Sequence, residues 1–170
     1  MALKYENTIY AAALSPSFSA ASQISPADMA AAAAAGFTLI VNARPDDEEP
    51  DQPASAELAA AAAEVGISYV HIPIDQEGVK PGHAAALKRA LNAAPSSKAL
   101  GFCLSGKRAA LLWAHVEAMT GRTVASVIAS AERADFHIAH HNHSLNAAYT
   151  AYCLAAARRA NPGAELELCA

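Results

Sequence analysis

A single stretch near the middle of the chain, residues 100–113, limits what the whole sequence can fold into. It reads Leu-Gly-Phe-Cys-Leu-Ser-Gly-Lys-Arg-Ala-Ala-Leu-Leu-Trp. The apolar run up to Phe102 predicts a short buried strand, and the residues from Arg108 onward have the spacing of an amphipathic helix. A small polar loop containing Gly106 joins the two. A strand that leads through a tight loop into a helix is a unit of layered α/β folds.

The loop after Cys103 has the features of an anion site. N–H groups of a glycine-containing loop can converge on one point, and a helix N-terminus adds positive potential there. The same field would stabilise a thiolate at Cys103, so the loop predicts covalent catalysis on an oxyanion substrate. This hypothesis requires the sulfur to reach the pocket and Arg108 to point into it. The simpler alternative is an ordinary buried cysteine at the end of a strand.

The rest of the chain alternates short apolar runs with alanine-rich segments of helical spacing. We expect strands at 17–22, 37–41, 67–72 and 98–102, the first at an edge of the sheet, and helices at 26–35, 53–64, 81–94, 108–120, 123–133 and 144–159. This alternation predicts an α/β layered fold with a largely parallel sheet. We divide the chain into an N-terminal arm (1–14), a single domain (15–160) and a C-terminal tail (161–170).

Three segments follow predicted parallel strands, at 42–47, 73–78 and 103–108. Ligands of such sheets bind beyond the carboxyl ends of the strands, so we expect these segments to converge. Arg44 is therefore a candidate for substrate binding; alternatively, it forms a salt bridge with the acidic loop that follows it. That loop, 46–51, is most simply a solvated turn. Beside an anion site, its carboxylates would disfavour highly anionic ligands.

Composition narrows the classes of function. Hydrophobic residues make up 54% of the 170 residues, charged residues 16%, and the net charge is −4. The chain is therefore globular, and without a basic stripe we expect no nucleic-acid partner. We also expect no membrane span and no signal peptide. Three widely spaced cysteines favour a reducing cytoplasm. The histidines at 137–143 lack a carboxylate or cysteine at metal spacing, so we expect no metal and no other cofactor.

Several motifs, in a fixed order along the chain, resemble those of a known family. They are Ser22–Asp28, Gly36-Phe37, Val41–Asp46, Tyr69–Ile74, Cys103–Arg108 and Ala134–Phe136. They resemble the bacterial β-lactamase-hydrolase-like phosphatase domain, and the order of the motifs is more specific than any one of them. The resemblance implies a three-layer α/β/α fold, tyrosine-phosphatase-like, with a mostly parallel sheet of four to five strands.

The same resemblance implies a cysteine-dependent phosphatase that acts on a phosphomonoester through a phosphocysteine intermediate. Cys103 would be the nucleophile, and Arg108 would hold the phosphoryl oxygens. The loop residues that would bind the substrate through their N–H groups are Leu104, Ser105, Gly106 and Lys107. The general acid would follow a hydrophobic-Pro-hydrophobic step, which favours Asp75, with Glu77 second. Asp75 could instead be a turn or helix-cap residue. The substrate would be a small anionic molecule or a phosphoprotein.

The active loop departs from the tyrosine-phosphatase pattern at three places. Arg108 is five positions after Cys103, one fewer than in those enzymes; Phe102 replaces the preceding histidine; and Ala109 replaces a hydroxyl residue. A loop of this length resembles that of the rhodanese sulfurtransferases. Two alternatives therefore remain: a rhodanese-type sulfurtransferase or persulfide carrier linked to sulfide metabolism, and a non-catalytic anion-binding module.

Overall fold

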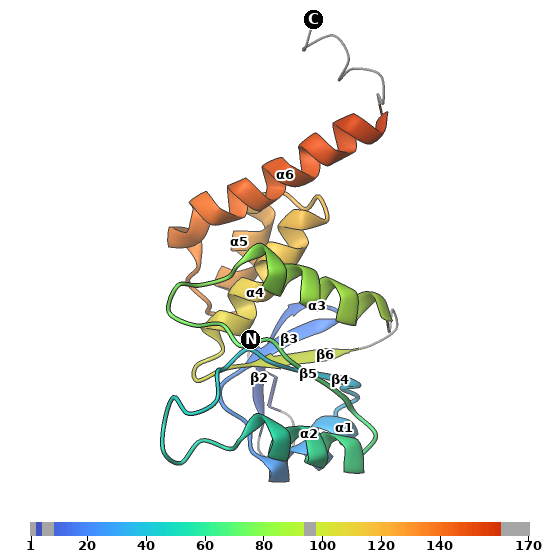
Figure 1. Ribbon diagram of the computed structural model, residues 1–170, viewed down its shortest axis with the longest axis vertical. Coiled ribbons are helices and arrows are strands. Elements are labelled where there is room, and N and C mark those ends of the chain that lie inside the picture. Colours follow the sequence, from blue (N-terminus) through green and yellow to red (C-terminus); the bar gives the residue numbers. More distant parts are fainter. Residues whose placement is uncertain (1–2, 5–8, 94–97, 161–170) are drawn as a thin grey trace, which may run out of the picture.

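A mixed sheet of six strands forms the centre of the molecule (Figure 1). The structure, a computed structural model, describes residues 3–4, 9–93 and 98–160. The strands are β1 (Leu3–Lys4), β2 (Tyr10–Ser15), β3 (Phe18–Ala21), β4 (Leu39–Asn42), β5 (Ser68–His71) and β6 (Ala99–Phe102). Their order is β1-β2-β3-β6-β4-β5. The four strands from β3 to β5 in this order are parallel, and β1 and β2 are antiparallel additions.

Helices cover both faces of this sheet (Figure 1). They are α1 (Met29–Ala34), α2 (Ser55–Glu64), α3 (Pro81–Ala93), α4 (Lys107–Met119), α5 (Val124–Arg133) and α6 (Asn142–Ala160). Helices α1 and α2 lie on one face, and α3, α4, α5 and α6 lie on the other. The predicted three-layer α/β/α fold is therefore confirmed. Among the described residues, no helix is long and apolar enough to cross a membrane.

The N-terminal strands differ from the prediction. Strand β3 is not at an edge, because it pairs with β2 on one side and with β6 on the other. Residues 10–14, which we expected in an arm, pair within the sheet as β2, where Ala11 and Leu14 are buried. The sheet therefore has one strand more than the upper number expected. Alanine-rich strands carry little β-forming signal, so the sequence alone did not reveal β2. Residues 161–170, the predicted tail, lie outside the described residues.

Helix α4 is the central helix of the fold. Most of its side chains are buried, including Leu112 and Trp113, because it lies between the sheet and helices α3, α5 and α6. A helix that is buried nearly all round is fixed by contacts on every side. The loop at the start of α4 is therefore held in place by the core of the protein.

Close packing beneath this loop depends on a glycine in β6. A Cβ at Gly101 would lie 2.7 Å from Cζ of Phe18 and 3.1 Å from Cβ of Ala109. Both neighbours are buried, so neither can move without disturbing the core. Gly101 thereby allows α4 to approach the sheet closely.

We expect Gly101→Ala to lower the free energy of unfolding by about 1–3 kcal/mol, because the added methyl overpacks the core. Urea denaturation measures this change. The matched control is Gly82→Ala, in helix α3, where a Cβ meets nothing within 4 Å. This control should be neutral or stabilising by up to about 1 kcal/mol. Equal unfolding midpoints for Gly101→Ala and the native protein would contradict the close approach.

Candidate active site

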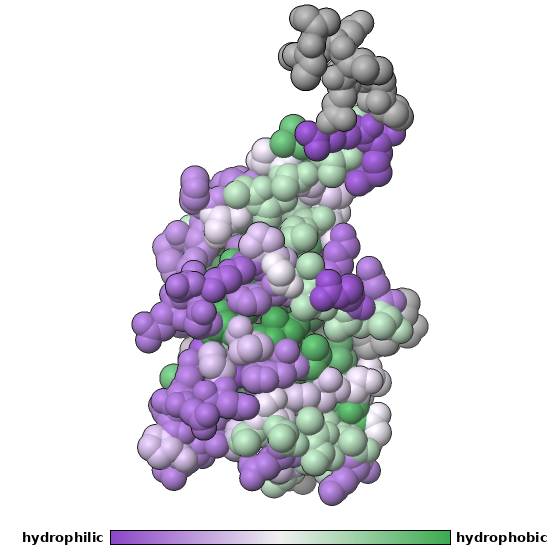
Figure 2. Space-filling model, viewed as in Figure 1, coloured by the Kyte–Doolittle hydropathy of each residue, from purple (hydrophilic) through white to green (hydrophobic). Residues whose placement is uncertain are grey.

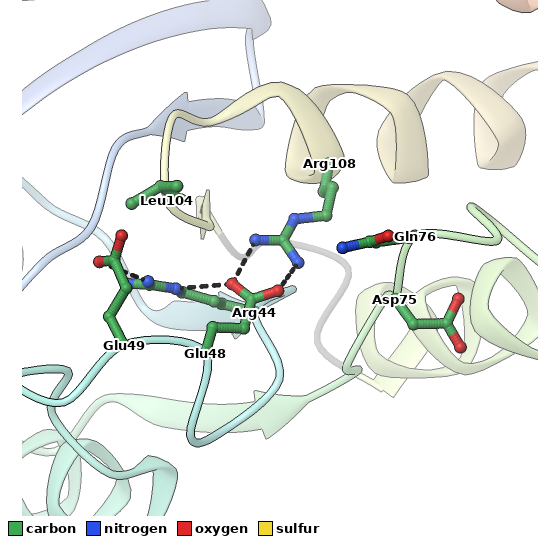
Figure 3. A pocket seen from close by; sticks show the side chains of 7 residues that line it. All are labelled: Arg44, Glu48, Glu49, Asp75, Gln76, Leu104 and Arg108. Carbon is green, nitrogen blue, oxygen red and sulfur yellow. Dashed lines mark hydrogen bonds and ion pairs between the residues drawn. The ribbon is translucent and has the colours of Figure 1, made fainter.

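The three predicted segments meet at one edge of the sheet. Asn42 at the end of β4 is in register with Phe102 of β6 and with His71 of β5, so the chain leaves all three strands at the same level. A cavity of about 470 Å³ lies there (Figure 3). It is lined by Arg44, Glu48, Glu49, Asp75, Gln76, Leu104 and Arg108.

The loop between β6 and α4 has a backbone that requires glycine. Gly106 has φ of +83°, and a Cβ there would lie 2.9 Å from a ring carbon of Phe136 and 3.0 Å from the carbonyl oxygen of Ala21. Within the described residues, the backbone N–H groups of 104–108 have no hydrogen-bond acceptor. Leu104 and Ser105 are exposed. The loop therefore offers unpaired donors at the start of α4, as an anion site needs.

Cys103 lies beneath this loop and is only 1% exposed. Burial to this degree gives the sulfur less access to the cavity than the cysteine hypothesis requires. The sulfur nevertheless lies close to the guanidinium of Arg108. The pKa of Arg108 is raised, chiefly by its hydrogen bonds to Glu48, and charge attraction and a hydrogen bond to Cys103 contribute to the same direction. A ligand bound to this guanidinium would therefore be next to the sulfur.

Arg108 is paired with a carboxylate of the acidic loop. The two terminal nitrogens of Arg108 donate to Oε1 and Oε2 of Glu48 at 2.6 and 2.7 Å (Figure 3). One of these nitrogens also donates to the carbonyl oxygen of Ile74 at 2.8 Å. The chain turns at Asp47, which has φ of +62°, just before Glu48. Hydrogen bonds from Arg108 lower the pKa of Glu48 to about 2, with burial opposing them and Arg44 adding to them. Glu48 is therefore ionised at neutral pH.

Arg44 is fully buried and surrounded by acceptors. It donates from Nε to Glu48 at 2.9 Å, and from its terminal nitrogens to Glu49 at 2.8 Å and to Gln23 at 2.8 Å. Burial lowers its pKa, but hydrogen bonds to Glu49 and Glu48 outweigh burial, so the pKa is raised overall. The predicted salt bridge to the acidic loop is confirmed. Arg44 also lines the cavity, so its proposed role in substrate binding stays a prediction.

Asp75 lines the cavity, but its carboxylate points away from Arg108 in Figure 3. It accepts a hydrogen bond from the backbone N–H of Glu77 at 2.9 Å, and Lys80 lies 3.4 Å away. The first of these contacts, together with Lys80, lowers the pKa of Asp75. Glu77 forms its own ion pair with Lys80 at 2.6 Å. In this arrangement Asp75 is a carboxylate that caps a turn, and not a proton donor.

Glu48 and Gln23 are the site residues that sequence reasoning did not single out. Glu48 stands four positions after Arg44, a spacing that allows an ion pair, but nothing local indicates that it also reaches Arg108, sixty positions away. Gln23 lies in the first of the family-like motifs, and its backbone N–H also donates to the carbonyl oxygen of Leu104 at 3.3 Å. In the part of the chain that the structure describes, no three potential ligands meet in a metal-binding group.

Comparison with known proteins agrees with this geometry. The family model described as "Beta-lactamase hydrolase-like protein, phosphatase-like domain" matches residues 11–120, which is more than half of the chain. The chain belongs to this phosphatase-like domain family. A beta-lactamase hydrolase-like protein of Xylella fastidiosa is 37% identical over 87 residues, which are 51% of this chain and 20% of that protein. The chain thus spans about a fifth of the length of this relative.

Solved structures similar to this phosphatase-like domain include a candidate phosphatase from Neisseria meningitidis. It is 25% identical, has a TM-score of 0.69, and the match covers 81% of this chain and 96% of that one. A kinase-associated phosphatase with its catalytic-site cysteine replaced by serine has a TM-score of 0.68 at 14% identity, over 89% and 98% of the two chains. The second similarity shows the fold alone, which is that of tyrosine phosphatases.

The low pKa of Glu48 predicts a pH-dependent contribution to stability. A carboxyl whose pKa falls from 4.5 in the unfolded chain to about 2 stabilises the fold above pH 4.5, and this stabilisation is lost as the pH falls toward 2. We expect Glu48→Gln to lower the free energy of unfolding at pH 7 by about 2 kcal/mol, after allowance for solvent screening. Urea titrations at several pH values measure this difference.

The difference between native protein and Glu48→Gln should shrink steadily below pH 4.5. Glu64→Gln, at an exposed position of helix α2, is the matched control and should unfold like the native protein at every pH. A difference that stays constant down to pH 2.5 would mean that Glu48 is not held as an ionised group by the two arginines.

Proposed function

We propose that this domain is a cysteine-dependent phosphatase that hydrolyses phosphomonoesters through a phosphocysteine intermediate. One observation carries the proposal: the guanidinium beside Cys103 already holds the two oxygens of a carboxylate, at 2.6 and 2.7 Å. Bidentate binding by arginine suits phosphate oxygens equally well. The membership of a phosphatase-like family and the tyrosine-phosphatase fold support the same function.

In the proposed reaction, the phosphoryl group of the substrate first displaces Glu48 from Arg108. The displaced acidic loop must also move far enough to give the phosphorus access to the buried sulfur. The Cys103 thiolate then attacks phosphorus, the new S–P bond forms, and the bond from phosphorus to the ester oxygen breaks. Arg108 and the loop N–H groups stabilise the charge on the phosphoryl oxygens. Water then attacks phosphorus and gives a proton to the carboxylate that had protonated the ester oxygen, the S–P bond breaks, and inorganic phosphate leaves as the thiolate is restored.

The ester oxygen needs a proton as it leaves, and we assign this role to Asp75, with Glu77 as the second candidate. The carboxylate of Asp75 must leave the N–H of Glu77 and Lys80, take up a proton and turn into the cavity. Both contacts are exposed and therefore weak, so little free energy is needed to break them. The substrate is a small anionic molecule or a phosphoprotein, and we place the reaction in the cytoplasm, where thiols stay reduced.

Sulfur transfer is the second candidate, because it needs Cys103 but no general acid, and Asp75 is ionised and turned away here. In that reaction Cys103 takes the outer sulfur of thiosulfate as a persulfide and releases sulfite. Cyanide then accepts the sulfur as thiocyanate and restores the thiolate.

We expect Cys103→Ser to reduce hydrolysis of p-nitrophenyl phosphate by about 10³-fold or more, because it removes the nucleophile. The matched control is Cys153→Ser, since Cys153 is exposed on helix α6 and should leave the rate unchanged. Release of p-nitrophenol measures the reaction, and transfer of sulfur from thiosulfate to cyanide is measured beside it. Sulfur transfer without phosphate release by the native protein would replace the phosphatase proposal with the sulfurtransferase.

The role of Asp75 is tested by the leaving group. We expect Asp75→Asn to slow hydrolysis of phenyl phosphate by about 10²-fold, because phenolate is a poor leaving group without a proton. The acidic leaving group of p-nitrophenyl phosphate should reduce this effect to a few-fold. Glu77→Gln provides the comparison with the other candidate acid. If Asp75→Asn slows the hydrolysis of both esters by the same factor, Asp75 is not the general acid.

A further inference from the structure

The cavity carries more negative than positive charge. Its lining includes two guanidiniums, Arg44 and Arg108, and three carboxylates, Glu48, Glu49 and Asp75. Both guanidiniums are already paired with carboxylates, at distances between 2.6 and 2.9 Å. The cavity is therefore short of one positive charge before any substrate enters. A phosphate dianion alone would make this imbalance worse.

A phosphoryl group that takes Arg108 leaves the carboxylate of Glu48 with only its contact to Nε of Arg44. Within the described residues, the nearby lysines do not offer a ready replacement. Lys80 is held by Asp75 and Glu77, and Lys107 lines a neighbouring cavity of about 240 Å³. A partly buried carboxylate that loses its partner is costly. The positive charge that offsets this cost can come from the substrate itself.

We propose that Glu48 is a specificity-determining residue, and that the preferred substrates are small phosphomonoesters with an ammonium group near the phosphoryl group. The phosphoryl group takes Arg108, and the ammonium group pairs with the released carboxylate of Glu48, with Glu49 beside it. Phosphomonoesters with further negative groups, such as carboxylates or second phosphates, are disfavoured. This inference rests on the proposed function, and it names the class of substrate for the same site.

The size of the cavity favours a small molecule. A volume of about 470 Å³ is within the range of small-molecule pockets, about 300–1,000 Å³. The carboxylates of Glu48 and Glu49 flank the guanidinium of Arg44 inside the cavity, as Figure 3 shows. A cationic group a few bonds from the phosphoryl group can therefore reach them while the phosphoryl group stays on Arg108.

The test uses three benzylphosphonates that differ only in their para substituent: cationic aminomethyl, neutral methyl and anionic carboxylate. These probes are not hydrolysed, so calorimetric titration measures their binding whether or not the protein is a phosphatase. We expect the native protein to bind the aminomethyl probe about fivefold tighter than the methyl probe, and the carboxylate probe about fivefold weaker, as for a partly exposed ion pair.

Glu48→Gln should bind all three probes more tightly, because Arg108 is released, and should bind the three with nearly equal affinity. Glu64→Gln, the exposed control, should keep the native order. If the native protein binds the three probes with equal affinity or in the reverse order, the inference is overturned, whatever the variant shows. If the native protein binds the three probes in the expected order but does not hydrolyse p-nitrophenyl phosphate, the phosphatase proposal is rejected and the charge preference stands.

Discussion

A single carboxylate, that of Glu48, lies between the two guanidiniums on which the site depends. It meets Arg108 with both oxygens and Arg44 with one. Arg44 is 1% exposed, and a charge buried to that extent is stable only when it is paired and hydrogen-bonded. The acidic loop after β4 is therefore part of the fold. Its carboxylates compensate the charge of a buried arginine.

This pairing also joins the three segments that leave the sheet. Arg108 comes from the start of α4, Glu48 from the loop after β4, and the carbonyl oxygen of Ile74 from the segment after β5. Gln23 adds the segment after β3, because it accepts from Arg44 and donates to Leu104. The segments around the cavity are thus held from four directions before a ligand arrives, but an anion that binds Arg108 must first displace Glu48 from it.

Local patterns in the sequence were sufficient for most of the fold and for part of the site. The strand, loop and helix around Cys103 could be predicted because apolar periodicity and a glycine are local signals. The alternation of strands and helices then placed the three segments at one edge of the sheet. Strand β2 was missed because alanine favours helices and not strands. The pair between Glu48 and Arg108 was missed because sixty residues separate the partners, and only the folded chain brings them together.

The same pair decides how the site must work if it hydrolyses phosphate esters. A phosphoryl group gains Arg108 only at the expense of Glu48, so the net affinity is the difference between two similar ion pairs. Weak binding of inorganic phosphate follows, since the carboxylate returns to Arg108 and displaces the product. To bind the transition state more tightly than the substrate, the site needs hydrogen-bond donors that Glu48 does not already occupy. The N–H groups of the loop beside Cys103 are such donors. Under the proposed function, Arg108 and Glu48 together would select the ligand, and the backbone N–H groups of the loop would accelerate the reaction.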